Sequence, residues 1–166
     1  MPNLYFILLV IFLMPFSLIM TWQILQLILL ESNYFKLCKK KTIDLSIDQL
    51  FVFVKILIKK RLWFKSLKLL ESLEDVDLSY RHKYFNIFGF IYYKIEQYNL
   101  AKKYYLKSLY LKNNYLVALQ NLAKVHELQK DYSLALKVYN SILSYDSNNK
   151  LANIKVARLK SRDSRI

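Results

Sequence analysis

The stretch QYNLAKKYYLKSLYLKNN at residues 97–114 decides the fold, because a later stretch of the chain repeats its pattern. That second stretch is DYSLALKVYNSILSYDSNN at residues 131–149. When the two are superposed, Ala101 falls on Ala135 and Tyr105 falls on Tyr139. Self-similarity at a fixed period of roughly 20–50 residues is typical of solenoids. We therefore expect one structural unit to recur along this part of the chain.

The period of about 34 residues matches two antiparallel helices joined by short turns, each helix of about 12–14 residues. Where such helices cross closely a small residue is needed, and Gly89 and Ala123 supply it on the first helix of each pair. Gly89 is the single glycine of the chain. Glycine in mid-helix costs about 1 kcal/mol relative to alanine. We therefore expect Gly89 to serve close packing.

An earlier, degraded copy of the unit begins near Ile47, with a spacing one residue longer and Val54 in place of the small residue. A last single helix follows the final copy from about Lys150. Stacked pairs share one continuous core, so the sequence predicts an all-α solenoid of about three helix pairs plus a capping helix over residues 47–166. The predicted repeats and cap lie at residues 47–81, 82–115, 116–149 and 150–162.

The N-terminal segment at residues 4–30 is uncharged and mostly apolar, LYFILLVIFLMPFSLIMTWQILQLILL. About 20 such residues cross a bilayer core as a helix, so we expect a transmembrane anchor over residues 1–31 that contacts the lipid bilayer. A cleaved signal peptide is disfavoured, because no basic residue precedes the segment, the run is too long, and no small-residue cleavage site follows. We expect Pro15 to kink the helix, and the polar side chains to be satisfied within it or by a neighbouring helix.

The residues after this segment are basic. Lys36, Lys39, Lys40 and Lys41 fall in a predicted juxtamembrane linker at residues 32–46. Basic flanks stay on the cytoplasmic side, so we expect the repeat domain to face the cytosol or a plastid stroma. The net charge of +14 lies wholly after residue 30 and favours acidic partners. We expect no nucleic-acid partner, because a membrane tether removes the chain from most nucleic acid.

The sequence offers little support for catalysis or for a metal. Cys38, His82 and His126 are isolated and lack the close pair spacings that zinc sites use. We find no nucleophile motif, glycine-rich phosphate loop or paired carboxylates at a spacing that suggests a site. The acidic residues between Glu71 and Asp77 fall where a predicted helix ends, which indicates a solvated turn. We therefore predict a protein that is not an enzyme and that has no metal or cofactor.

The repeat resembles the tetratricopeptide repeat (TPR) family. The best copy carries the resemblance at Phe85, Phe88, Gly89, Tyr92, Ala101 and Tyr105. The next copy departs from the pattern at His126, where the family has an aromatic residue, and the usual proline between repeats is absent. In that family the first helix of each pair lines a concave face that binds peptides. Carried over position by position, this implies a groove of Phe51, Lys55, Ile58, Lys59, Asn86, Phe90, Tyr93, Lys94, Gln120, Lys124 and Glu127.

These groove residues are basic and aromatic, which suits an acidic or amphipathic protein segment. The alternative is that some of them only cover the neighbouring helix. Members of the family that bind chaperone tails clamp a carboxylate with Lys and Asn, and at the matching places here Lys124 alone keeps a compatible charge. We therefore do not expect a clamp for chaperone tails.

A basic repeat domain behind one N-terminal anchor is similar to the plastid-encoded, membrane-anchored TPR proteins of algae and their cyanobacterial relatives. The richness in Lys, Asn, Ile, Tyr and Phe fits a low-GC coding context such as an organelle genome. That family is implicated in assembly or stability of photosystem I, so the resemblance implies a thylakoid scaffold for protein–protein interaction. Two alternatives stay open: a receptor or adaptor for protein import, and a tether for ribosomes or RNA. The oligomeric state and the identity of the partner also stay open.

Overall fold

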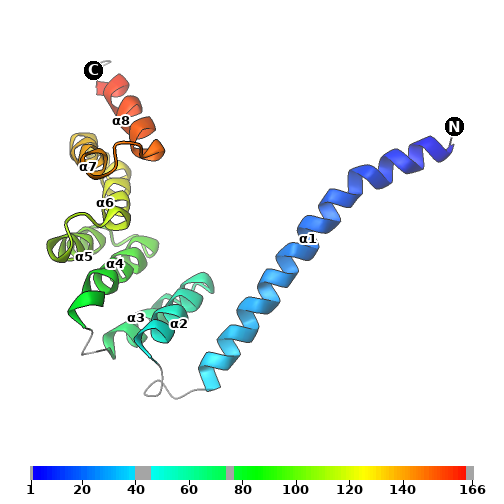
Figure 1. Ribbon diagram of the computed structural model, residues 1–166, viewed down its shortest axis with the longest axis horizontal. Helices are drawn as coiled ribbons and strands as arrows, with labels where there is room; N and C mark the ends of the chain where they lie inside the picture. The colour runs from blue at the N-terminus through cyan, green and yellow to red at the C-terminus, as the bar shows by residue number, and fades with distance from the viewer. Residues whose placement is uncertain (1, 40–45, 74–76, 164–166) are drawn as a thin grey trace. The chain divides into compact units, whose positions relative to one another are not determined.

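The computed structural model describes residues 2–39, 46–73 and 77–163, and the regular secondary structure of this described part is helical, without a strand. The all-α prediction is thus confirmed (Figure 1). The helices are α1 (Pro2–Lys39), α2 (Ile47–Lys59), α3 (Trp63–Glu71), α4 (Leu78–Lys94), α5 (Tyr98–Leu111), α6 (Leu116–Leu128), α7 (Tyr132–Tyr145) and α8 (Lys150–Asp163).

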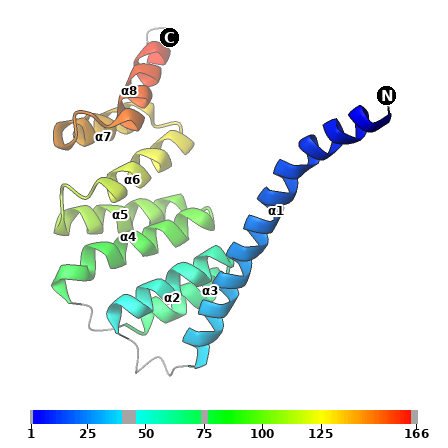
Figure 2. The ribbon, with the colours of Figure 1, turned by 45° about the vertical axis from the view of Figure 1, so that its right-hand side comes forward.

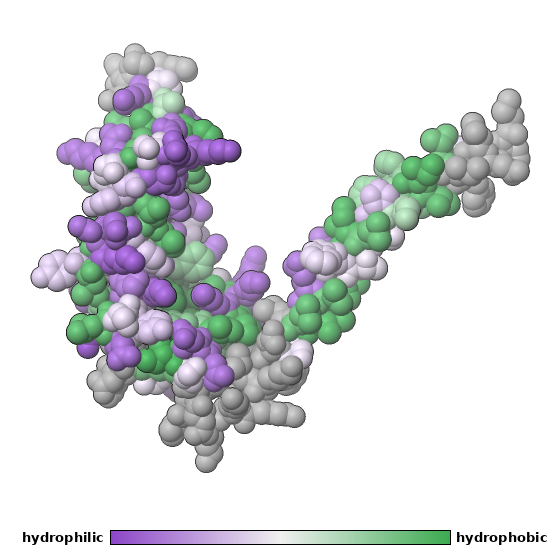
Figure 3. Space-filling view, viewed as in Figure 1, coloured by the Kyte–Doolittle hydropathy of each residue, from purple (hydrophilic) through white to green (hydrophobic). Residues whose placement is uncertain are grey.

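Helix α1 contains a segment, Leu8–Leu29, that is long and apolar enough to cross a membrane, with a mean hydropathy of 2.1. None of its side chains is buried inside the protein, and Figure 3 shows its surface as mostly hydrophobic. Pro15 lies inside the helix. The helix continues to Lys39, so residues 32–39 of the predicted linker are helical. Residues 40–45 of that linker, with Lys40 and Lys41, lie outside the described residues.

The chain divides into two compact units, Met1–Lys60 and Arg61–Ile166, and the division falls inside the first predicted repeat. In the first unit, α2 begins with a capping box in which Ser46 and Gln49 bond each other's backbone amides. The Lys60 ammonium pairs with the Glu31 carboxylate of α1 at 2.5 Å. Val54, which replaces the small residue of the later repeats, is fully buried.

In the second unit, each helix from α3 to α8 packs against the next one in sequence (Figure 2). Helices α4 and α6 also contact each other, so the first helices of successive pairs lie side by side. This is the arrangement of a helical solenoid, in which contacts run between neighbours along the stack.

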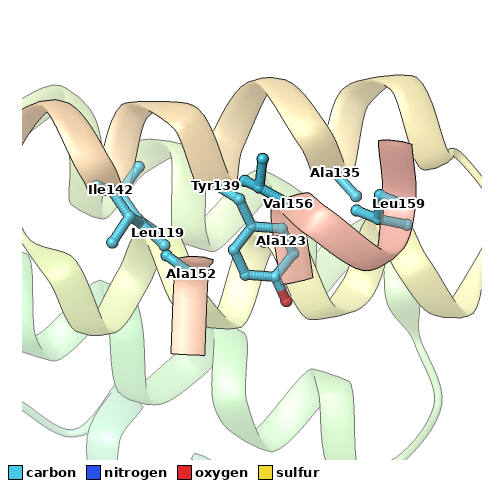
Figure 4. Close-up of a cluster of buried hydrophobic side chains, with 8 residues drawn as sticks. All are labelled: Leu119, Ala123, Ala135, Tyr139, Ile142, Ala152, Val156 and Leu159. Carbon is cyan, nitrogen blue, oxygen red and sulfur yellow. The ribbon is translucent and has the colours of Figure 1, made fainter. Parts of the chain in front are cut away.

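The core of the second unit follows the predicted register. Ala101 and Tyr105 of α5 are fully buried, and the ring of Tyr105 lies directly against Gly89 of α4. One repeat later, Figure 4 shows Tyr139 lying among Ala123, Ala135, Val156 and their neighbours, which come from α6, α7 and α8. The small residues of the repeat therefore make room for one buried tyrosine ring per pair.

The turn inside each pair also repeats. Arg61, Glu96 and Lys130 each adopt a left-handed backbone conformation, with φ of 57°, 64° and 64°. The sequence separation between Arg61 and Glu96 is one residue longer than that between Glu96 and Lys130. This longer spacing after the first repeat was expected from the sequence. In the last two turns, the amides of Gln97 and Asp131 donate to the carbonyls five positions earlier, at 2.9 Å in each case. Such bonds satisfy carbonyls left over at a helix C-terminus, and here non-glycine residues adopt the conformation.

Candidate functional site: a groove between helices α6 and α8

A cavity of about 400 Å³ opens between α6 and α8 in the second unit. Its lining residues are Gln120, Asn121, Lys124, Glu127, Leu128, Tyr139, Leu151 and Lys155. The three groove residues predicted on α6, namely Gln120, Lys124 and Glu127, are thus brought together. Because α6 and α8 stand one repeat apart, the cavity lies on the face formed by the first helices of successive repeats.

The carboxylate of Glu127 is held on both oxygens. The Tyr139 hydroxyl donates to Oε1 at 2.5 Å, and the Lys155 ammonium donates to Oε2 at 2.7 Å. Burial opposes ionisation of Glu127, but these two hydrogen bonds and the positive charges of Lys155 and Arg158 outweigh it and hold the pKa of the carboxyl below its ordinary value. Burial and the Glu127 carboxylate together raise the pKa of Tyr139. The acidic group of the cavity is therefore already neutralised by the protein.

Lys124 is exposed and stands over an aromatic ring of the preceding repeat. Its Nζ lies 5.3 Å from the centroid of Tyr93 on α4. Lys94 lies over the rings of Phe90 and Tyr93, at 5.4 and 5.6 Å. At such distances a ring face attracts a cation. Four of the predicted groove residues therefore form one basic and aromatic cluster that joins α4 to α6.

Asn86 is the predicted groove residue on α4 that the structure buries, with 8% of its surface exposed. Its side-chain oxygen accepts a hydrogen bond of 3.2 Å from Nδ2 of Asn121 on α6. Asn86 therefore joins two adjacent helices and presents little surface to a ligand. Asn121, which lines the cavity, was not predicted from the sequence.

The four predicted groove residues on α2 belong to the first unit. Phe51 is buried and Ile58 is half-buried, whereas Lys55 and Lys59 are exposed. These residues stay a prediction for that unit, separate from the cavity between α6 and α8.

Tyr139, Leu151 and Lys155 are cavity residues that the sequence analysis did not assign to the groove. Tyr139 was matched in the sequence only to Tyr105 of the preceding repeat, and helix α8 was expected only as a cap. The signal for Lys155 was available, because it stands one repeat after Asn121 and so takes the same place on the next first helix. The cap therefore contributes the far wall of the cavity.

The cavity offers recognition chemistry. Lys124 and Lys155 line it, and Lys155 is paired with Glu127, so Lys124 is the cation open to a ligand. The apolar side chains of Leu128 and Leu151, each about half exposed, form part of the lining. Among the residues that the structure describes, no three His, Cys, Asp or Glu side chains gather closely enough to hold a metal ion. The groove can therefore attract an anionic group and cover an apolar one on the same ligand.

Comparison with known proteins agrees with this architecture. A family model described as "Tetratricopeptide repeat" matches residues 82–115, the same residues as the second predicted repeat. The protein ycf37 of Porphyra purpurea is 35% identical over 164 residues, which cover 92% of this chain and 94% of that protein. The protein ycf37 of Pyropia yezoensis is 32% identical over 162 residues, which cover 92% of this chain and 91% of that protein.

The first TPR domain of Spaghetti (RPAP3), solved with a bound HSP90 peptide, shares the fold with a TM-score of 0.62. That comparison covers 69% of this chain and 93% of the domain, at 15% sequence identity. The likeness at this identity concerns the fold alone.

Proposed function

The chain belongs to the ycf37 family and has the TPR fold, and from that premise we propose that it is a membrane-anchored scaffold that holds a segment of another protein in its groove. The TPR fold is a scaffold for protein–protein interaction. The observation that carries the proposal is the cavity between α6 and α8, because it joins an exposed lysine, a neutralised carboxylate and apolar lining in one concave site.

The expected ligand is an acidic or amphipathic protein segment. Glu127 is engaged by Lys155 and Tyr139, so it does not oppose an incoming carboxylate. Lys124 and Lys94 keep the α4–α6 face positive, while Phe90 and Tyr93 supply ring surface beside them. Complementary charge raises association rates and favours correct partners over wrong ones.

The anchor in this proposal is the Leu8–Leu29 segment of α1. A span fixed by the basic residues that follow it leaves the repeat domain on the stromal side of a plastid thylakoid membrane. Confinement to the membrane raises the effective concentration of the groove toward membrane-bound partners. The partner proposed here is an unassembled subunit or an assembly factor of photosystem I. The alternative is a receptor or adaptor for protein import or for ribosome or RNA tethering.

The experiment that tests this function is affinity purification of the tagged full-length protein from native membranes solubilised in mild detergent, with mass spectrometry of the accompanying proteins. The variant Lys124→Ala removes a cation from the groove. Lys137→Ala removes the same charge from an exposed site on α7 that does not line the cavity. We expect photosystem I subunits or assembly factors to accompany the wild type and Lys137→Ala, and their recovery to fall several-fold with Lys124→Ala.

Two results would contradict the proposal. Equal recovery from both lysine variants would show that the groove does not hold the partner. Recovery of ribosomes or translocase components without photosystem I subunits would support the alternative instead. A ribosome or RNA tether is also expected to lose its partner steeply as salt rises, without preference for a protein sequence.

A further inference from the structure

The polar side chains of helix α1 differ in how their hydrogen bonds are satisfied. The Ser17 hydroxyl donates to the Met14 carbonyl, and the Thr21 hydroxyl donates to the Leu18 carbonyl, both at 2.9 Å. These two groups are therefore satisfied by their own helix. The amides of Gln23 and Gln26 have no such partner in the described part of the chain, although both lie within the membrane-crossing segment. A primary amide carries two donor hydrogens and an acceptor oxygen, all of which need partners away from water.

Gln23 and Gln26 lie on one face of α1, because residues three apart on a helix are neighbours. Ile19 precedes Gln23 by four positions, and Phe16 and Phe12 continue the same face toward the N-terminus. The rings of Phe12 and Phe16 lie 5.5 Å apart, in agreement with a shared face. The steps along this face alternate between four and three positions, which is the spacing of a seam between two packed helices.

This face is not the one that meets the rest of its unit. Helix α2 reaches α1 at Glu31, through the ion pair with Lys60. At about 100° per residue, Glu31 lies about 140° round the helix from Gln26 and about 80° from Gln23, and so about 100° from the middle of this face. The side chains of the apolar segment, with Gln23 and Gln26, are exposed throughout. The amide-bearing face is therefore open to another helix.

Gln23 and Gln26 differ in their depth in the membrane. At about 1.5 Å per residue, Gln26 lies about 4–5 Å from the Leu29 end of the segment, and Gln23 lies about 9 Å inside it. The amide of Gln26 can reach the interface by extending along the helix. Gln23 is too deep for that, so it creates the stronger requirement for a partner inside the bilayer.

We propose that α1 associates with the α1 of a second copy of this chain, with Gln23 and Gln26 of one copy bonded to those of the other. This inference rests on the anchor assigned under the proposed function. Every copy enters the membrane with the same orientation, so identical residues of two parallel helices meet at the same depth across a twofold axis. An amide is both donor and acceptor, so it complements itself there, whereas an unrelated helix must supply a matching group at that depth.

The test uses the full-length chain with Cys38, its single cysteine, replaced by serine, and one new cysteine in α1. Ile19→Cys places the thiol on the proposed seam. Ile28→Cys is the matched control, since it lies nine positions later and therefore on the opposite side of the helix. Under mild oxidation in the membrane we expect disulfide-linked dimers from Ile19→Cys and only background from Ile28→Cys, although residue 28 is nearer the interface and more accessible to oxidant.

A second measurement identifies the groups responsible. The double variant Gln23→Met, Gln26→Met removes both amides and nearly preserves side-chain volume. Ser17→Ala, Thr21→Ala removes two polar groups that bond their own helix. Energy transfer between labelled copies in lipid vesicles, followed over a range of protein-to-lipid ratios, should show an association constant lowered about tenfold in the glutamine variant and unchanged in the other.

Each contrary outcome has a definite meaning. Equal crosslinking at both positions, crosslinking to a different protein, or unchanged association without the glutamines would overturn the second-copy seam. Alkaline carbonate extraction distinguishes failure of the membrane anchor from failure of the association between α1 helices. If the chain stays in the membrane but does not associate, the seam fails and the anchor stands. If carbonate releases the chain, the anchor fails and the seam fails with it.

Discussion

Replacing Gly89 with alanine tests the packing on which the solenoid is built. A Cβ placed on Gly89 would lie 2.6 Å from Cδ1 and from Cε1 of Tyr105, and 3.1 Å from its Cγ. Carbon atoms in ordinary contact are about 3.5–4.0 Å apart, so the ring would have to move by about 1 Å. Tyr105 is fully buried, and a rigid ring at that depth cannot move without displacing its neighbours. The conflict therefore falls on the core of the α4–α5 pair.

Two effects of opposite sign set the magnitude. Alanine is favoured over glycine in a helix interior by about 1 kcal/mol. Overpacking a well-filled core costs about 1–3 kcal/mol. Because two ring atoms are approached at once, we take the upper half of that range. Gly89→Ala should therefore lower the free energy of unfolding by about 1–2 kcal/mol, against the direction that helix propensity alone predicts.

The assay is urea unfolding of the full-length protein in mild detergent, followed by helical circular dichroism, in which α1 gives a constant background. The decisive control is the same substitution in a Tyr105→Leu protein. Leucine removes the ring atoms that the new methyl group would meet, so Gly89→Ala should become neutral or stabilising there, by up to about 1 kcal/mol. A stabilising effect in the wild-type protein, or an equal loss in both backgrounds, would refute the reasoning.

Two further predictions concern the turn and the groove. Lys130 adopts φ of 64°, so Lys130→Gly should raise the free energy of unfolding by about 0.5–1 kcal/mol. The control Lys137→Gly, inside α7, should lower the free energy of unfolding by about 1 kcal/mol. A loss of stability in both variants would contradict the assignment of the turn. Glu127 has a folded-state pKa held below its unfolded value by Lys155 and Tyr139, against the effect of burial. Its charge therefore contributes stability that is fully present above about pH 4.5 and is lost as pH falls through the folded pKa. The stability difference between wild type and Glu127→Gln should follow that pH course in urea titrations, and a difference independent of pH would exclude the carboxylate as its source.

The fold was largely predictable because the same kinds of packing residue recur at equivalent positions of successive repeats. Gly89, Ala101 and Tyr105 could be matched to Ala123, Ala135 and Tyr139 by a shift of one repeat, and these residues do lie in the buried cores. The degraded first copy follows the same rule, since Val54, Ser66 and Leu70 are each fully buried. The end of the N-terminal helix was less visible in the sequence. A change from apolar to charged residues indicates where the chain passes from lipid to water. A helix can continue across that boundary, as α1 does to Lys39.

The groove was predictable only as a set of positions. A family register predicts which residues share a face, and the structure places Gln120, Lys124 and Glu127 in the lining of one cavity. It does not state which polar side chains bond each other across helices. The bond that buries Asn86 and the pairing of Glu127 with Lys155 depend on side-chain reach between helices far apart in sequence. Such contacts follow from the packed structure and not from periodicity.

Helix α8 has a consequence for the kinetics of binding. Among the described helices it packs against α7 and is bonded to α6 through Lys155, and it carries Leu151 and Lys155, which form one wall of the cavity. Stability is not uniform along a stack of helices, and a helix with few packed neighbours opens more readily than one packed on both sides. The cavity therefore exists only while α8 is closed, and a ligand that fills it must favour the closed state. Opening of α8 would then let a ligand enter and leave the cavity. A bound ligand would be detected as slower hydrogen exchange of the backbone amides along α8.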